Sequence, residues 1–283
     1  MKKADMSPED LKEQYLELIK KSLLNEIYLQ NEARIYYLRD CLENGGAFHY
    51  DVLHDIAGKR PDIFAEYKRS RAEGSLPFRN IHHAGFQHSM IGRARMNNLH
   101  HCLDLIRNDG IPGDVIECGV WRGGAVIFIT AYMKTHGLKD RRVFMADSFE
   151  GLPPPRRTDE PDLSADKYPQ LAISLEDVIK NFQAYDLWDG SVEVLKGWFS
   201  DTLPDAPIDQ LALLRADGDL YSSTRDILDN LYDKVVPGGV VIIDDFGIVP
   251  SCAKAVNDFF EERSEKVPAY EEIDFTGVYW RKP

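Results

Sequence analysis

The chain has 283 residues but few cysteines, no long apolar segment and no excess of positive charge. Its four cysteines show no Cys-x-x-Cys spacing, which argues against structural zinc and a disulfide framework and favours a reducing cytoplasm. No run approaches the ~20 apolar residues of a membrane helix, and residues 1–10 lack the apolar centre of a signal peptide. A net charge of −13 argues against a nucleic-acid-binding protein, which needs a basic face.

Strands and helices alternate along most of the chain, which predicts a doubly wound, mostly parallel α/β sheet. Residues 7–42 have helical spacing with a break expected near Tyr28 to Asn31, and residues 43–88 indicate short helices and loops. We therefore expect a helical appendage over residues 1–88 and an α/β domain over residues 89–283. Strands are expected at 115–118, 143–146, 192–195, 211–216, 240–243 and 278–280, helices at 90–108, 123–136, 174–186, 224–234 and 252–263, and a turn at 237–239.

A glycine-rich turn separates the first expected strand from the helix that follows it. Its sequence, from Glu117 to Gly124, is neither a phosphate-binding loop with Gly-Lys-Ser/Thr nor a clean G-x-G-x-x-G. Glycines at such a turn let the backbone approach a ligand, and Asp147 at the end of the next strand is placed to bind ribose hydroxyls. Glu117 ends a buried strand and needs a partner, such as a ligand ammonium group. Together these residues favour a nucleoside cofactor, although each of them taken alone is also compatible with a purely structural role.

Two acidic clusters follow the expected strands 211–216 and 240–243, both interpreted as buried apolar runs. They are Asp217-Gly218-Asp219 and Asp244-Asp245. Parallel strands place their carboxyl ends along one edge, where these carboxylates would repel each other and resist desolvation. A hard divalent cation, which prefers oxygen ligands, would remove that difficulty. Lys196-Gly197-Trp198-Phe199 follows a third strand and either flanks an adenine ring or packs in the core.

These motifs resemble the macrocin O-methyltransferase family. The resemblance covers nearly the whole chain and is carried by residues 15–20, 25–28, 89–92, 113–124, 147–153, 197–204, 216–221, 237–239 and 242–247. It implies a Rossmann-like class I methyltransferase fold with an N-terminal helical lid that also contributes to a homodimer or higher homo-oligomer. It further implies that S-adenosylmethionine and Mg²⁺ are used to methylate a sugar hydroxyl of a small, glycosylated natural product in antibiotic biosynthesis.

The resemblance also implies roles for individual residues. Asp217, Asp244 and Asp245 would bind Mg²⁺, and Asp219 would be the general base. Cofactor binding is expected for Ser89, Met90, Glu117, Cys118, Gly119, Val120, Trp121, Asp147, Ser148, Phe149, Glu150, Gly151, Ser174, Gly197 and Trp198.

The expected reaction is an SN2-like methyl transfer in which the metal lowers the pKa of the acceptor hydroxyl and Asp219 accepts its proton. Asp219 is alternatively a fourth metal ligand. Three other functions are compatible with parts of the pattern: a catechol-type Mg²⁺-dependent O-methyltransferase, a nicotinamide-dependent dehydrogenase and a non-catalytic binding protein. The sequence assigns no role to the loop at 153–173 or to His82, His83 and His88.

Overall fold

A computed structural model describes residues 6–79 and 85–283, so His82 and His83 lie outside the described residues. The chain forms two compact units, Met1–Met96 and Asn97–Pro283. Within the described ranges, no helix is both long enough and apolar enough to cross a membrane.

The first unit is helical, as the sequence predicts. Helix α1 starts with a capping box between Ser7 and Asp10 and has Pro8 in its first turn, which satisfies free backbone N–H groups there. The chain breaks between α1 and α2 at residues 24–28, slightly earlier than expected, where Asn25 has a φ of 54°. The elements are α1 (Pro8–Leu23), α2 (Leu29–Asn44), α3 (Tyr50–His54), α4 (Ile56–Lys59), α5 (Pro61–Glu73) and the short 3-10 helix η1 (Pro77–Arg79).

Helices α2 and α5 pack against each other around an apolar core that includes Ala33, Ile63 and Tyr67. A buried ion pair between Glu32 and Arg71 joins the same two helices. Because a buried charge without a partner is costly, this pair ties α2 to α5 specifically.

The second unit is built on a seven-stranded sheet of order β3-β2-β1-β4-β5-β7-β6. Strands β1 to β5 are parallel, and β7 pairs antiparallel with both β5 and β6, which confirms the doubly wound, mostly parallel sheet. The strands are β1 (Asp114–Cys118), β2 (Val143–Asp147), β3 (Val192–Lys196), β4 (Leu211–Ala216), β5 (Val235–Ile243), β6 (Glu271–Glu272) and β7 (Val278–Arg281).

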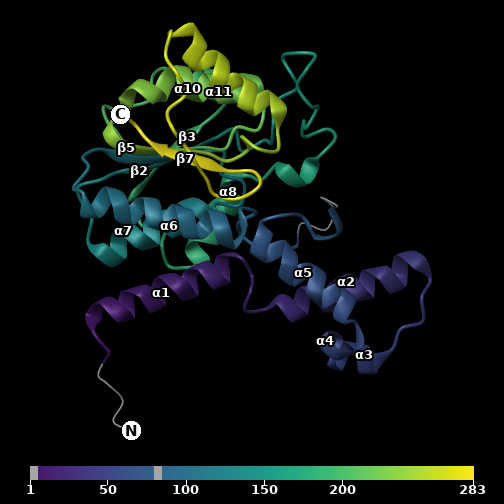
Figure 1. The fold of residues 1–283 in the computed structure, drawn as a ribbon. Coiled ribbons are helices and arrows are strands. Elements are labelled where there is room, and N and C mark those ends of the chain that lie inside the picture. The colour runs from purple at the N-terminus through teal and green to yellow at the C-terminus, as the bar shows by residue number, and fades with distance from the viewer. Residues whose placement is uncertain (1–5, 80–84) are drawn as a thin grey trace. The chain divides into compact units, whose positions relative to one another are not determined.

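Helices cover both faces of this sheet (Figure 1). Helices α6, α7 and α8 lie on one face, and α10 and α11 on the other. An apolar cluster that includes Ile116, Leu214, Ile227 and Phe260 fills one side of the sheet. The helices are α6 (Gly92–Asn108, which begins in the first unit), α7 (Gly124–His136), α8 (Leu175–Ala184), the short α9 (Phe199–Thr202), α10 (Tyr221–Leu231) and α11 (Pro250–Glu262).

Two expected boundaries in the second unit are wrong. The residues expected to form a turn at 237–239 lie inside β5. The register between β4 and β5 shifts between Val235 and Val240, and the extra residues form an irregularity of the strand there. Helix α10 begins at Tyr221 instead of residue 224, and the backbone N–H of Ser222 in its first turn donates to the Glu160 carboxylate at 2.7 Å. A distant side chain thus satisfies a helix terminus that has no local cap.

Candidate active site

The carboxyl ends of β1, β4 and β5 lie side by side, and this register sets the site. Cys118 pairs with Ala216, and Ala216 with Ile243. The residues after these positions stay attached to the neighbouring strand, since Asp217 N donates to Cys118 O at 2.8 Å and Asp244 N to Ala216 O at 3.0 Å. Both acidic clusters therefore reach the same edge of the sheet.

Three of the four clustered carboxylates converge closely enough to bind one cation. Asp217, Asp244 and Asp245 each place an oxygen within 4.8 Å of the other two. Asp244 is buried, and the other two are half-buried. Oxygens at such spacing can coordinate one Mg²⁺, which prefers carboxylate ligands in octahedral geometry, so the residues fit the expected ion.

A buried arginine, which the sequence analysis did not identify, lies among these carboxylates. Nη1 of Arg215 donates to Glu117 Oε1 and to Asp217 Oδ2, both at 2.7 Å, and Nη2 donates to Asp244. Only 1% of its side chain is exposed. Burial disfavours its charge, but the three carboxylates outweigh burial and raise the pKa of Arg215 well above its usual value.

Arg215 corrects the premise that the acidic clusters need a metal to offset their repulsion. Part of that repulsion is offset by the chain's own guanidinium. The signal was present in the sequence, because Arg215 is the one charged residue in a strand interpreted as apolar throughout. What favours a metal site is therefore the convergence of three oxygens, not uncompensated charge.

Glu117 links this network to the glycine-rich turn. Its Oε1 bonds Arg215, whereas its Oε2 is buried and has no hydrogen-bond partner in the part of the chain that the structure describes. Burial raises the pKa of Glu117 to about 8; the Arg215 charge opposes this shift, and the charges of Asp217 and Asp244 add to it. A ligand ammonium at Oε2 would supply the missing donor and a favourable charge, so the residue fits the expected methyl donor.

The glycine-rich turn is fixed by close backbone contacts. Gly119 has a φ of 90°, and a Cβ at this position would lie 1.9 Å from the carbonyl oxygen of Asp217. Only glycine fits there. Trp121, at a φ of 47°, is in the left-handed region that non-glycine residues seldom adopt, and such strain is concentrated at functional sites.

Asp147 holds two loops together at the ends of β1 and β2. Its Oδ2 accepts a hydrogen bond from Val120 N at 2.6 Å, and its Oδ1 accepts one from Phe149 N at 2.7 Å. Burial raises the pKa of Asp147, and these backbone N–H groups oppose the shift. Its expected bond to a ribose stays a prediction beside this observed structural role.

The other residues expected at the cofactor occupy several loops. Gly197 N donates to Asp147 O at 2.9 Å, which places Gly197 and Trp198 beside the end of β2. Ser148 Oγ donates to Gly151 O at 2.7 Å and shapes the turn that contains Glu150. Ser174 caps α8, as predicted, because its Oγ accepts a hydrogen bond of 3.1 Å from Asp177 N. Ser89 and Met90 belong to the first unit, and their role toward the cofactor also stays a prediction.

Asp219 differs from its three acidic neighbours, because it is not part of the converging oxygen triad. Its backbone is left-handed, with a φ of 54°, and the residue as a whole is half-buried. Loss of hydration raises the pKa of Asp219 to about 8, and the charges of Asp217, Asp244 and Asp147 add to the shift. A carboxyl group with a raised pKa is a better proton acceptor than an ordinary aspartate.

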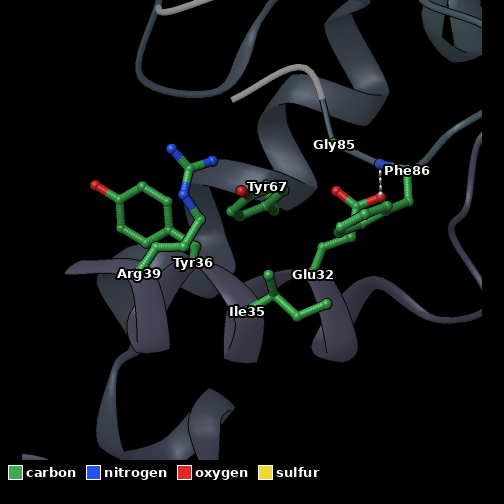
Figure 2. Close-up of a pocket in the computed structure, with 7 residues that line it drawn as sticks. All are labelled: Glu32, Ile35, Tyr36, Arg39, Tyr67, Gly85 and Phe86. Atoms are coloured by element: carbon green, nitrogen blue, oxygen red, sulfur yellow. Dashed lines mark hydrogen bonds between the residues drawn. The ribbon is translucent and has the colours of Figure 1, made fainter. Parts of the chain in front are cut away.

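The first unit contains a separate pocket of about 190 Å³ (Figure 2). Glu32 lines it and accepts a hydrogen bond from Phe86 N at 3.1 Å, and it also bonds Arg71. The carboxylate charge is therefore already compensated. The pocket is also smaller than the ~300–1,000 Å³ typical of ligand sites, so we do not place the active site here. The lining residues are Glu32, Ile35, Tyr36, Arg39, Tyr67, Gly85 and Phe86.

Comparison with known proteins identifies relatives of the whole chain. Residues 12–282 match the model of the macrocin O-methyltransferase (TylF) family. Mycinamicin III 3''-O-methyltransferase of Micromonospora griseorubida is 38% identical over 98% of this chain and 99% of its own. A Streptomyces olivaceus enzyme, 8-demethyl-8-(2,3-dimethoxy-α-L-rhamnosyl)-tetracenomycin-C 4'-O-methyltransferase, is 41% identical over 96% of this chain and 94% of its own.

A solved structure, that of the O-methyltransferase NovP, has the same fold. It is similar with a TM-score of 0.75 and 36% identity, over 96% of this chain and 99% of NovP. The dehydrogenase and the non-catalytic binding protein are therefore excluded. The chain belongs to the macrocin O-methyltransferase family and is a class I O-methyltransferase.

Proposed function

We propose that this enzyme transfers a methyl group from S-adenosylmethionine to a sugar hydroxyl of a glycosylated natural product, in antibiotic biosynthesis. The observation that carries the proposal is the network in which Arg215 joins Glu117, beside the glycine-rich turn, to Asp217 and Asp244 of the oxygen triad. A donor site and a metal site then adjoin each other. The Streptomyces olivaceus relative, whose substrate name includes a rhamnosyl group, supports a sugar acceptor.

On the donor side, the chain offers a cation-binding carboxylate and a close backbone. S-adenosylmethionine supplies an activated methyl group, so its sulfur needs no acid to leave. Glu117 Oε2 would bind the donor's ammonium group, and Gly119 leaves room for the ligand to approach the turn. Asp147, Gly197 and Trp198 lie at the adjoining strand ends, where the ribose and adenine are expected.

On the acceptor side, Asp217, Asp244 and Asp245 would hold Mg²⁺. The ion would supply Lewis-acid polarisation that makes a sugar hydroxyl easier to deprotonate. Arg215 contributes by fixing the carboxylates of Asp217 and Asp244 in one orientation before any ligand arrives. Such preorganisation lowers the cost of binding and of reaching the transition state.

Asp219 would take the proton that the acceptor loses. The step would balance: the sulfur–methyl bond of the donor would break, an oxygen–methyl bond would form, and the Asp219 carboxylate would accept the hydroxyl proton. Its raised pKa and its position two residues from Asp217 suit that role.

A methylation assay tests the acceptor class and the metal together. We expect transfer from S-adenosylmethionine to glycosides with a free sugar hydroxyl, with turnover at least ~100-fold higher than on the matched aglycones or on a catechol. EDTA should lower this turnover by at least ~100-fold, as expected when several kcal/mol of transition-state stabilisation is lost, and excess Mg²⁺ should restore it. Preferred methylation of the catechol, or full activity in EDTA, would contradict the proposal.

Asp219→Asn tests the base. Turnover should fall ~100-fold, at the low end for loss of a positioned base, whereas Mg²⁺ and S-adenosylhomocysteine affinities measured by calorimetry should change less than about twofold. Asp186→Asn is a matched control, because Asp186 is exposed and has a similar left-handed backbone, with a φ of 55°. Near-normal turnover of Asp219→Asn would show that Asp219 is not the base, and loss of Mg²⁺ affinity would make it a ligand.

A further inference from the structure

The segment between β2 and α8 contains a closed loop to which the sequence assigns no role. Leu152 and Ser164 form an isolated parallel bridge, which closes residues 152–164 into an Ω-shaped loop. A Cβ on Gly151 would lie 3.2 Å from the Cβ atoms of both Ala165 and Ala172, so the neck of the loop is closely packed. Long loops that are packed in this way are frequently functional.

Glu160 anchors this loop to the start of α10. Its Oε1 accepts two hydrogen bonds from Ser222, from the backbone N and from Oγ, each at 2.7 Å. Its Oε2 accepts from the backbone N–H groups of Arg156 and Arg157, at 2.7 and 3.1 Å. Only 7% of Glu160 is exposed. A buried carboxylate that accepts four hydrogen bonds is strongly held. One of its oxygens bonds the start of α10, and the other bonds the backbone of the loop itself.

Neighbouring contacts strengthen the same attachment. Arg156 pairs with Asp226 of α10 at 2.9 Å, and it also donates to Ser200 Oγ at 3.2 Å. The guanidinium of Arg157 lies 4.2 Å from the ring centroid of Tyr221, the first residue of α10. Unlike Glu160, these arginines are partly exposed, so their individual contributions are expected to be small.

The loop and the segment after it are attached on two sides of the active site. Ser222 is three residues past Asp219, so the Glu160 anchor holds the helix that directly follows the acidic cluster. Farther along, Gln170 O accepts a hydrogen bond of 3.2 Å from Trp121 Nε1, which belongs to the glycine-rich turn. The segment from 152 to 170 thus connects the metal side of the strand-end edge to its donor side.

We propose that Glu160 is a positioning residue that holds the 152–164 loop in place as a wall of the acceptor site. This role rests on the proposed placement of the acceptor beside Asp217 and Asp219. Glu160 acts through the loop and through α10, and it does not itself contact the donor. Its loss should therefore weaken acceptor binding and leave the donor site intact.

Glu160→Gln tests this role, because the new amide NH₂ would face N–H donors on one side of the anchor. We expect the KM for the best acceptor of the wild type to rise about tenfold. The kcat and the Kd for S-adenosylhomocysteine should change less than threefold. Tryptic cleavage after Arg156 and Arg157 should be about tenfold faster. Ser222→Ala, which removes one of the four bonds, should give a smaller change in the same direction, and Asp166→Asn, at an exposed residue just after the loop, is the control.

Each outcome decides between the alternatives. An unchanged acceptor KM, or a parallel loss of S-adenosylhomocysteine affinity, would overturn the positioning role. Unchanged proteolysis of Glu160→Gln would show that Glu160 does not hold the loop. Failure of the wild type to methylate any glycoside would instead refute the sugar acceptor, and the acceptor that it does methylate would then be used for the KM measurement.

Discussion

Replacing Arg215 by leucine is expected to lower the free energy of unfolding by about 3–5 kcal/mol, the range for removal of one partner from a buried ion network. The substitution removes the cation that three carboxylates share. Those of Glu117 and Asp244 are buried, and that of Asp217 is half-buried. For a unit of this size the melting temperature should fall by roughly 10 °C. Thermal and urea unfolding followed by circular dichroism would measure the change.

Two further variants separate charge from geometry. Arg215→Lys keeps the positive charge but cannot reproduce the fork of donors, so its stability should be intermediate. Arg281→Leu removes an exposed pair with Asp109, of 2.7 Å, and should cost no more than about 1 kcal/mol. If Arg215→Leu is as stable as Arg281→Leu, the buried network is not a major source of stability.

Replacing Asp245 by asparagine is expected to lower turnover by about 1,000-fold, because loss of the metal removes about 4 kcal/mol of transition-state stabilisation. Asp245 is the best of the three proposed ligands for this test, since the hydrogen bonds that Arg215 donates to Asp217 and Asp244 remain in this variant. The fold should therefore be preserved. Calorimetry should show Mg²⁺ affinity at least ~10-fold weaker, within the range for altered metal sites.

The control for Asp245→Asn is the same substitution at the exposed Asp205, which lies away from the strand-end cluster in sequence and should leave turnover and Mg²⁺ affinity unchanged. S-adenosylhomocysteine binding without Mg²⁺ should be the same in both variants and in the wild type. Normal turnover of Asp245→Asn would remove Asp245 from the metal site. Normal Mg²⁺ affinity with low turnover would give it a catalytic role other than ligation.

Much of the second unit was predictable, because its signals are local. The apolar runs at 115–118 and 143–146, the Ser174 cap and the glycines after Glu117 depend on residues that are close in sequence. Alternation of strands and helices then restricts the sheet to a doubly wound topology with strand ends along one edge. The convergence of Asp217, Asp244 and Asp245 follows from that topology.

Features that depend on distant partners were missed or misplaced. The start of α10 was expected too late, because its first turn is stabilised by Glu160, 62 residues earlier. The prediction of a turn at 237–239 is wrong, because two long-range contacts keep these residues in the sheet. They are the pairing of β5 with β4 and the hydrogen bond that Gly238 N donates to Lys282 O. Local propensity describes neither contact, since both are decided by which segments meet in space.

The sequence by itself determined the class of fold, the family and the edge of the sheet on which the acidic residues gather. Only the tertiary structure decided how their charges are balanced. Glu117 and Arg215 are 98 residues apart in the sequence, but they pair in the register of β1 with β4. This pairing places Arg215 Nη1 2.7 Å from Glu117 Oε1. A buried charge must find a partner, but spacing along the chain does not say which one. The acidic clusters that seemed to need only a metal are thus organised first by an arginine of the sheet itself.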